Sequence, residues 1–351
     1  MKAVRVVLPV LVLLTIALVA GAQSRRYPLP PKSGGITHSP QSFSAQTQNQ
    51  PEALPAKYTF LELDPLGTGE GYCYADAHAI NDLDQVVVDW SDPADCNILH
   101  ASLWDNGKWT LLDYSIDPNC SEPATYLTSI TDLGFAFGTY WSACPYSPAG
   151  GVFVRTHNWY FLPDIKGFPY NQGTSMNNFG QAVGSASVWD SESNQWSYKH
   201  WLWDGKHYSY PMFPPSWDVN DTWAGPLFIN DFGRVAGQFW DLSAAGRRRG
   251  YVQDGRKLTI IDAPNNPIRT GVNGINDIGE VLVIGRYADG DTSYPASFLW
   301  TQGAFTRLPD VPFQGSVETY VYGLNNRGDL SGIWVDNDDL THAFVAVRHY
   351  K

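Results

Sequence analysis

One short motif recurs six times along the chain, and this internal repeat restricts the fold more than any other feature. Each copy has a large apolar residue, then Asn or Thr, then Asp or Asn, a variable residue and a final Gly or Asp. The copies begin at Ile80, Ile130, Met176, Ile229, Ile275 and Leu324. Their second residues are separated by 50, 46, 53, 46 and 49 positions. A repeat of about fifty residues is typical of propellers and other repeat arrays.

The chemistry of the motif indicates a tight turn between two strands. Asn hydrogen-bonds to backbone groups that follow it, and Gly accepts a positive φ at no steric cost. A second turn signal recurs at a similar distance after the motif, as in residues 103–107, and a further strand-like run follows it. Each repeat therefore predicts four short strands, and six such units predict an all-β, six-bladed β-propeller. Tandem β-sandwiches are the alternative, but their units are normally about twice as long.

The two ends of the repeat region predict how the ring closes. Residues 58–63 resemble a fourth strand, whereas the chain ends near residues 342–347, which resemble a third strand. The N-terminal strand is therefore expected to complete the last blade, which leaves no long unpaired edge. The residue before each apolar turn position is small in five repeats, as the crowded innermost strand of a blade requires.

The repeat resembles the probable extracellular repeat family, also called the HAF repeat family, of exported bacterial proteins. The resemblance rests on the Ile-Asn-Asp-x-Gly-x-Val-x-Gly run at residues 229–237 and on His342-Ala343-Phe344. Residues 100–104 are a near match, and the other repeats lack the His. The resemblance implies export and repeated β structure, and it implies no particular activity or catalytic residue.

The N-terminal residues predict export. Residues 1–22 have a basic start, an apolar core and an Ala-Gly-Ala cleavage site, which together are typical of a signal peptide. Residues 23–56 are rich in Pro, Ser, Gln and Thr and are interpreted as a flexible linker. Residues 57–351 then form the propeller domain. We expect a secreted or periplasmic protein with no membrane span in the mature chain; an uncleaved N-terminal anchor is the alternative.

Charge restricts the class of partner. The whole chain has a net charge of −12, and residues 57–351, with 18 basic and 34 acidic side chains, have a net charge of −16. Such a domain lacks the broad positive surface that sequence-independent nucleic-acid binding needs. The expected partner is an extracellular protein or a polysaccharide.

The two kinds of loop predict where a partner binds. The Asn-Asp-x-Gly turns and the Asp-Gly turns share one face, so the longer connections lie on the opposite face, where function is expected. The aromatic-rich part of that face comprises Trp189 and Trp196 in one predicted long loop and Trp217, Asp218 and Trp223 in the next connection. Exposed indole rings beside carboxylates suit sugar rings; packing between blades is the alternative role.

No catalytic or metal motif supports an enzyme. The sequence has no G-x-S-x-G, no H-E-x-x-H and no suitably placed G-x-G-x-x-G. Acidic runs at residues 289–291 and 336–339 offer oxygen atoms for calcium, but neither has EF-hand spacing, and solvated turns are the alternative. His100 and His342 occupy equivalent repeat positions and predict a strand-pairing role. We therefore expect a non-catalytic binding propeller without a cofactor; a polysaccharide hydrolase or lyase is the alternative function.

The four cysteines predict two disulfides, since an even number in an exported chain favours oxidation. Cys73 and Cys96 flank the first turn motif, and Cys120 and Cys144 flank the second at nearly the same distances. Each pair thus lies at the start of a first strand and in the loop after the second strand, which antiparallel pairing brings together. The predicted bonds are Cys73–Cys96 and Cys120–Cys144.

Overall fold

The computed structural model describes residues 57–65, 74–92, 95–113, 123–142, 150–155, 158–221, 224–244, 246–289 and 292–349. The predicted signal peptide and linker lie outside the described residues, as do Cys73, Cys120, Cys144 and the side chain of Cys96. The disulfide pairing and the boundaries of the N-terminal segments therefore stay predictions.

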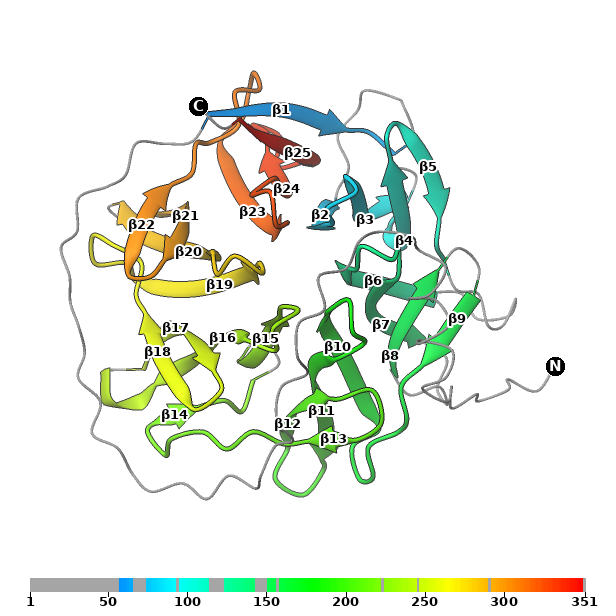
Figure 1. The fold of residues 1–351 in the computed structure, drawn as a ribbon, viewed down its shortest axis with the longest axis vertical. Coiled ribbons are helices and arrows are strands. Elements are labelled where there is room, and N and C mark those ends of the chain that lie inside the picture. Colours follow the sequence, from blue (N-terminus) through cyan, green and yellow to red (C-terminus); the bar gives the residue numbers. More distant parts are fainter. Residues whose placement is uncertain are drawn as a thin grey trace.

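The described strands form six antiparallel sheets around a central axis (Figure 1). The first sheet along the chain comprises β2 (Ala75–Ile80), β3 (Gln85–Asp92), β4 (Asp95–Asp105) and β5 (Lys108–Leu111). The second comprises β6 (Pro123–Ile130), β7 (Ala136–Ser142), β8 (Gly150–Arg155) and β9 (Asn158–Phe161). The third comprises β10 (Tyr170–Met176), β11 (Ala182–Asp190), β12 (Gln195–Trp203) and β13 (Tyr208–Ser209).

The remaining three sheets follow the same plan. The fourth comprises β15 (Gly225–Ile229), β16 (Val235–Asp241), β17 (Arg247–Asp254) and β18 (Lys257–Ile261), with β14 (Trp217–Asp218) also paired to β16 and a 3₁₀ turn at Leu242–Ala244. The fifth comprises β19 (Arg269–Ile275), β20 (Val281–Asp289), β21 (Thr292–Thr301) and β22 (Ala304–Arg307). The sixth comprises β23 (Glu318–Leu324), β24 (Leu330–Val335), β25 (Thr341–His349) and, from the start of the domain, β1 (Lys57–Leu63).

The order of strands within the sheets is that of a propeller. The first strand of each repeat lies nearest the axis, and the following strands lie progressively further out (Figure 1). Strand β1 pairs antiparallel with β25 from Lys57 opposite His349 to Leu63 opposite Ala343. The prediction of an all-β propeller is confirmed.

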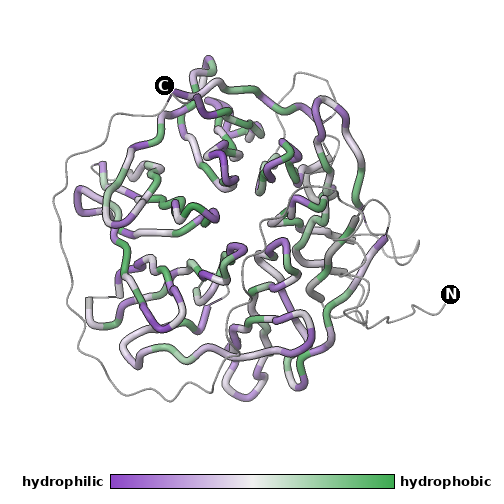
Figure 2. Tube along the Cα trace, viewed as in Figure 1, coloured by the Kyte–Doolittle hydropathy of each residue, from purple (hydrophilic) through white to green (hydrophobic). Residues whose placement is uncertain are grey.

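Apolar side chains fill the space between neighbouring sheets. Six buried clusters are present in the described residues, and each joins two consecutive sheets. Leu127 of the second sheet, for example, packs with Val87 and Ala101 of the first, and Phe137 packs with Trp201 of the third. Figure 2 shows hydrophobic segments within the sheets and hydrophilic segments at the inner turns beside the axis. Burial between sheets therefore stabilises the ring.

A β-bulge interrupts the innermost strand of every sheet, three residues before the second residue of the turn motif. Opposite the bulge, a Cβ on the repeat's second glycine would lie only 1.9–2.1 Å from a backbone carbonyl oxygen in four sheets. Those glycines are Gly138, Gly184, Gly237 and Gly332. The second glycine of the motif is thus explained by close approach of two backbones.

Several connections between the second and third strands of a sheet, on the face opposite the turn motifs, are shorter than predicted. Asp289 pairs with Thr292, so β20 and β21 are joined by two residues, and Asp92 pairs with Asp95 in the same way. The predicted long loop between Trp189 and Trp196 is also wrong, because β11 and β12 stay paired as far as Asp190 and Gln195. Cross-strand pairing extends these strands beyond the hydrophobic runs that marked them in the sequence.

Candidate functional site

The end of the β11–β12 hairpin forms an exposed aromatic pair. Trp189 and Trp196 lie directly opposite each other on the two strands, and their ring centroids are 5.4 Å apart at an interplanar angle of 61°. Tyr170 of β10 lies 5.4 Å from Trp196 in an edge-to-face contact. Trp189 is 42% exposed and Trp196 is 38% exposed. Two indole rings are therefore available to a ligand on one hairpin.

A tight turn holds this hairpin in place. The Asp190 carboxylate accepts a hydrogen bond from the Ser193 hydroxyl at 2.7 Å and one from the Glu192 amide at 2.9 Å, and the first of these contributes most to the lowered pKa of Asp190. Asn194 completes the turn with a φ of 55°. An ionised carboxylate is therefore part of this hairpin turn at neutral pH.

The connection to the fourth sheet lies against the same strand. The Asn220 side chain accepts a hydrogen bond from the Tyr198 amide at 3.1 Å and donates one to the Trp196 carbonyl oxygen at 3.3 Å. The Asn220 amide in turn donates to the exposed Asp218 carboxylate at 2.9 Å. The structure therefore brings Trp189, Trp196 and Asp218 into one region of the surface, as the sequence placed them.

Trp217 lies elsewhere. Its ring stacks on Phe239 with centroids 3.6 Å apart and an interplanar angle of 10°, and it lies 5.2 Å from the Tyr251 ring. Tyr251 is fully buried within the fourth sheet. Trp217 therefore packs against side chains of its own sheet, whereas the alternative role expected from the sequence was packing between blades. Trp223 lies outside the described residues.

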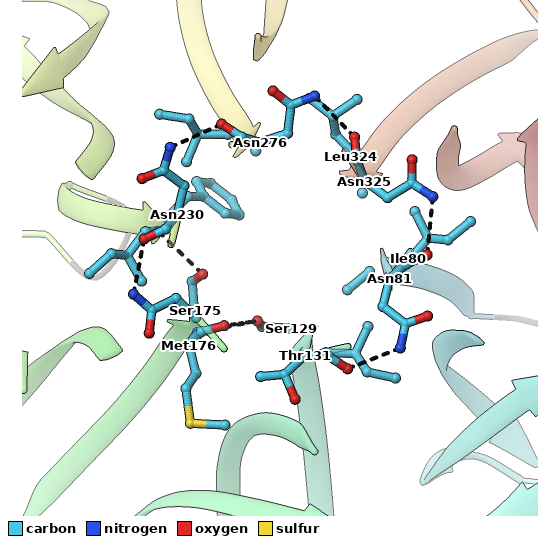
Figure 3. Close-up of a pocket in the computed structure, with 18 of the residues that line it drawn as sticks. Ile80, Asn81, Ser129, Thr131, Ser175, Met176, Asn230, Asn276, Leu324 and Asn325 are labelled. Atoms are coloured by element: carbon cyan, nitrogen blue, oxygen red, sulfur yellow. Dashed lines mark hydrogen bonds between the residues drawn. The ribbon is translucent and has the colours of Figure 1, made fainter. Parts of the chain in front are cut away.

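The axial channel is lined by the turn motifs of all six repeats. The Asn81 side-chain amide donates to the Thr131 carbonyl oxygen at 2.9 Å, and four further Asn side chains donate to the next repeat at 2.9–3.0 Å (Figure 3). Thr131 has no side-chain amide, and at that step the Ser129 hydroxyl instead donates to the Met176 carbonyl oxygen and accepts from its amide. Side chains of the turns therefore join consecutive sheets around the channel.

The third residues of the six motifs form a second, complete circle of hydrogen bonds. The backbone amide of each residue donates to the side-chain Oδ1 of its counterpart in the next repeat at 2.7–2.8 Å. In order, these six residues are Asp82, Asp132, Asn178, Asp231, Asp277 and Asn326, which we term the polar ring. The sequence predicted six separate hairpin turns and missed that they bind one another.

Charge and amide groups are matched within the polar ring. The Asn178 amide nitrogen donates to the carboxylates of Asp132 and Asp231 at 2.8 and 2.9 Å, and Asn326 does the same for Asp82 and Asp277 at 2.9 Å. Each of the four carboxylates thereby receives one side-chain amide hydrogen besides one backbone amide hydrogen. Two pairs of carboxylates, Asp82 with Asp132 and Asp231 with Asp277, remain direct neighbours with no side-chain amide between them. Burial and then the charge of Asp277 raise the pKa of Asp231 to about 6.

A second group of ionisable side chains lies along the first sheet. His78 lines the channel, and its Nε2 lies 3.4 Å from Asp89, 3.9 Å from Asp76 and 3.3 Å from the Tyr74 hydroxyl. Burial raises the pKa of Asp89 to about 6, although His78 opposes the shift. Burial alone would lower the pKa of His78, but the hydrogen bond that its ring donates to Asp89 and the negative charge of Asp89 raise it. Asp89 is fully buried and accepts from the Leu127 amide, so it links the first two sheets.

The other sequence candidates have structural partners. His100 and His342 lie opposite Trp90 and Trp334 on the neighbouring strands and pack against those rings with centroids 4.5 and 4.0 Å apart, which confirms their strand-pairing role. The Asp336 carboxylate accepts backbone amides within its own turn and lies 3.2 Å from His342. Across the described ranges, no group of three His, Cys, Asp or Glu side chains is arranged to hold a metal ion.

Comparisons with known proteins identify no family for this chain. No family model matches it, and no curated protein matches it. In the described part of the chain, no helix is long and apolar enough to cross a membrane.

Several solved structures are similar at low identity. A protein of unknown function from Dyadobacter fermentans is 12% identical, with 85% of this chain and 99% of that chain covered and a TM-score of 0.49. A mutant Aleuria aurantia lectin in complex with Fucalpha1-6GlcNAc is 9% identical, with 80% and 96% covered and a TM-score of 0.42. The β-propeller domain of the Trilobed protease from Pyrococcus furiosus is 11% identical, with 75% and 89% covered and a TM-score of 0.43. Such likeness concerns the fold and indicates no ligand.

Proposed function

We propose that this protein is a non-catalytic, carbohydrate-binding propeller that acts outside the cytoplasm. In this proposal each of the six sheets is one blade, and β1 closes the ring by completing the last blade. The observation that carries the binding function is the exposed Trp189–Trp196 pair, with the Asp190 and Asp218 carboxylates nearby. Indole faces pack against the apolar faces of sugar rings, and carboxylates accept hydrogen bonds from hydroxyl groups.

The β11–β12 hairpin supports this function because its backbone is already ordered before a ligand binds. Its turn is fixed by Asp190, and its outer strand is fixed by Asn220, so a ligand has little backbone to order. Preorganisation of this kind lowers the entropic cost of association. The alternative, polysaccharide cleavage, gains no support from Asp89, because this carboxylate has no exposed surface and links two sheets.

Affinity electrophoresis of the full chain through gels that contain soluble polysaccharides tests the proposal. We expect at least one neutral glucan, xylan or galactomannan to retard the parent protein. Trp189→Ala and Trp196→Ala should each weaken binding at least tenfold, which corresponds to about 1.4 kcal/mol. Tyr294→Ala is a matched control, since Tyr294 is an equally exposed aromatic side chain, at 48%, on a different hairpin. Equal loss in this control, or no retardation of the parent in any gel, would contradict the proposal.

A further inference from the structure

The turn face of the ring carries exposed apolar side chains at one repeated position. The fourth residue of the turn motif is Leu83, Leu133, Phe179, Phe232, Ile278 and Arg327 in the six repeats. Leu83 is 56% exposed, Phe179 67%, Phe232 57% and Ile278 60%. These four are a quarter of the sixteen exposed large hydrophobic side chains in the described residues. Turn geometry makes no demand for an apolar side chain at this position.

These apolar side chains stand beside one another around the axis. The residue that precedes each of them belongs to the polar ring, whose members are joined directly by hydrogen bonds from one turn to the next. Single exposed hydrophobic residues are common on protein surfaces, whereas a grouped set marks an interaction site. We term the six side chains at this fourth position, five of them apolar and the sixth Arg327, together the apolar rim.

Negative charge lies inside the apolar rim. The polar ring contributes four carboxylates, all partly exposed at the channel mouth, and only two neutral amides. The sixth rim residue, Arg327, pairs with Asp84 and Asp329, and its charge also acts on Asp82. The face therefore combines apolar side chains at the edge with an excess of carboxylates over cations at the centre.

This combination of apolar side chains and negative charge favours one class of binding partner over others. A second copy of the chain, docked face to face, would bring four carboxylates against four others. An anionic membrane would meet the same repulsion. A polypeptide with a cationic side chain between apolar ones matches both features, because the cation meets the carboxylates while its neighbours cover exposed carbon.

We propose that the turn face, formed by the apolar rim around the polar ring, is a docking site for a partner protein loop that carries Lys or Arg flanked by large apolar residues. This surface is separate from the β11–β12 hairpin and from the proposed carbohydrate binding. It also lies on the face opposite to the one on which the sequence predicted function.

A peptide selection on the full chain tests the proposal. A display library of random cyclic heptapeptides is selected on the parent protein and counter-selected on the triple variant Leu83→Ser, Phe179→Ser and Ile278→Ser. We expect the selected peptides to contain Lys or Arg between apolar residues and to bind the parent at least tenfold more tightly than the variant in fluorescence anisotropy. Replacing the peptide cation by Glu should weaken binding at least tenfold, and added NaCl should weaken binding of the original peptide.

Other outcomes would overturn the proposal. Selected peptides without a cation, or with equal affinity for the triple variant, would remove its basis. Sedimentation velocity and flotation with phosphatidylcholine vesicles test the other occupants: self-association, or lipid binding, that the triple variant abolishes would assign the face to a second copy or to a membrane. The triple variant should keep the thermal midpoint of the parent and its retardation by polysaccharide, because all three side chains point into solvent from turns.

Discussion

Replacing Asn178 by Asp should destabilise the protein strongly, and more at pH 7 than at pH 5. Asn178 donates both hydrogens of its side-chain amide to carboxylates, at 2.8 Å to Asp132 and 2.9 Å to Asp231. An Asp side chain has the same shape and keeps the Oδ1 acceptor that the Asp132 amide uses. The substitution therefore changes the hydrogen-bond donors and the charge of the polar ring but not its volume.

The size of the effect follows from the two states open to the new carboxyl group. If it ionises, two hydrogen bonds to charged acceptors are lost, at roughly 1.5–3 kcal/mol each. Five carboxylates, from Asp82 to Asp277, then follow one another around the polar ring. If it is protonated, it still donates one hydrogen bond, but protonation at pH 7 costs about 4 kcal/mol relative to an ordinary Asp. Either way we expect a loss of about 5 kcal/mol at pH 7. At pH 5 the protonation cost falls by about 2.7 kcal/mol, so the protonated state prevails and the loss shrinks to roughly 3 kcal/mol.

Urea unfolding followed by tryptophan fluorescence, at pH 7 and at pH 5, measures this difference directly. Asn194→Asp is the matched control, since it adds the same charge at an exposed turn residue outside the polar ring and should change stability by less than about 0.5 kcal/mol. The reasoning fails if Asn178→Asp costs less than about 1 kcal/mol at pH 7, or if its cost is equal at the two pH values.

Three further predictions concern the closed ring, its backbone contacts and its ionisation. Removing residues 23–56 should leave the thermal midpoint unchanged, whereas removal through residue 63 deletes β1, exposes the edge of β25 and should cause aggregation or a large fall in the midpoint; equal melting of the two truncations would argue against ring closure. Gly332→Ala should lower stability by several kcal/mol, because the new Cβ would lie 2.0 Å from the Tyr320 carbonyl oxygen, and an unchanged urea midpoint would refute that contact. The pKa values of Asp89 and Asp231 are each raised to about 6, so folding favours the protonated forms of these side chains. The free energy of unfolding should therefore rise as pH falls from 7 through 6 toward 4, and this gain should be lost as pH rises again. A urea midpoint that falls steadily from pH 7 to pH 4 would contradict these raised pKa values.

The sequence predicted the propeller because its signals are local. Asn-Asp-x-Gly specifies a turn through contacts within five residues, as the Asn81 carboxamide oxygen shows by accepting the amides of Leu83 and Gln85. Repetition of such turns at intervals of about fifty residues indicates how many strands lie between them. Strand ends were less predictable, because β11 and β12 continue to pair through residues whose side chains are exposed.

The individual roles of aromatic residues were not predictable from the sequence. Trp189 and Trp217 are each followed by Asp, and nothing in the adjacent residues separates them. The difference arises from the aromatic rings that each Trp contacts. Trp217 packs against Phe239 and Tyr251. Within the described structure, the ring that Trp189 contacts is that of Trp196. Such contacts depend on residues far apart in the chain.

Comparing equivalent positions of the repeats separates structural residues from candidate functional ones. The Asn of the motif donates to a carbonyl oxygen of the next repeat wherever it is present, so its recurrence is explained by the hydrogen bonds around the channel. The fourth position of the motif offers no side-chain donor or acceptor in the first five repeats, because it is apolar in all five. An exposed apolar side chain that the turn does not require needs another explanation. Contact with a partner that covers the turn face supplies one, and the serine variants test it without disturbing the bonds that hold the ring together.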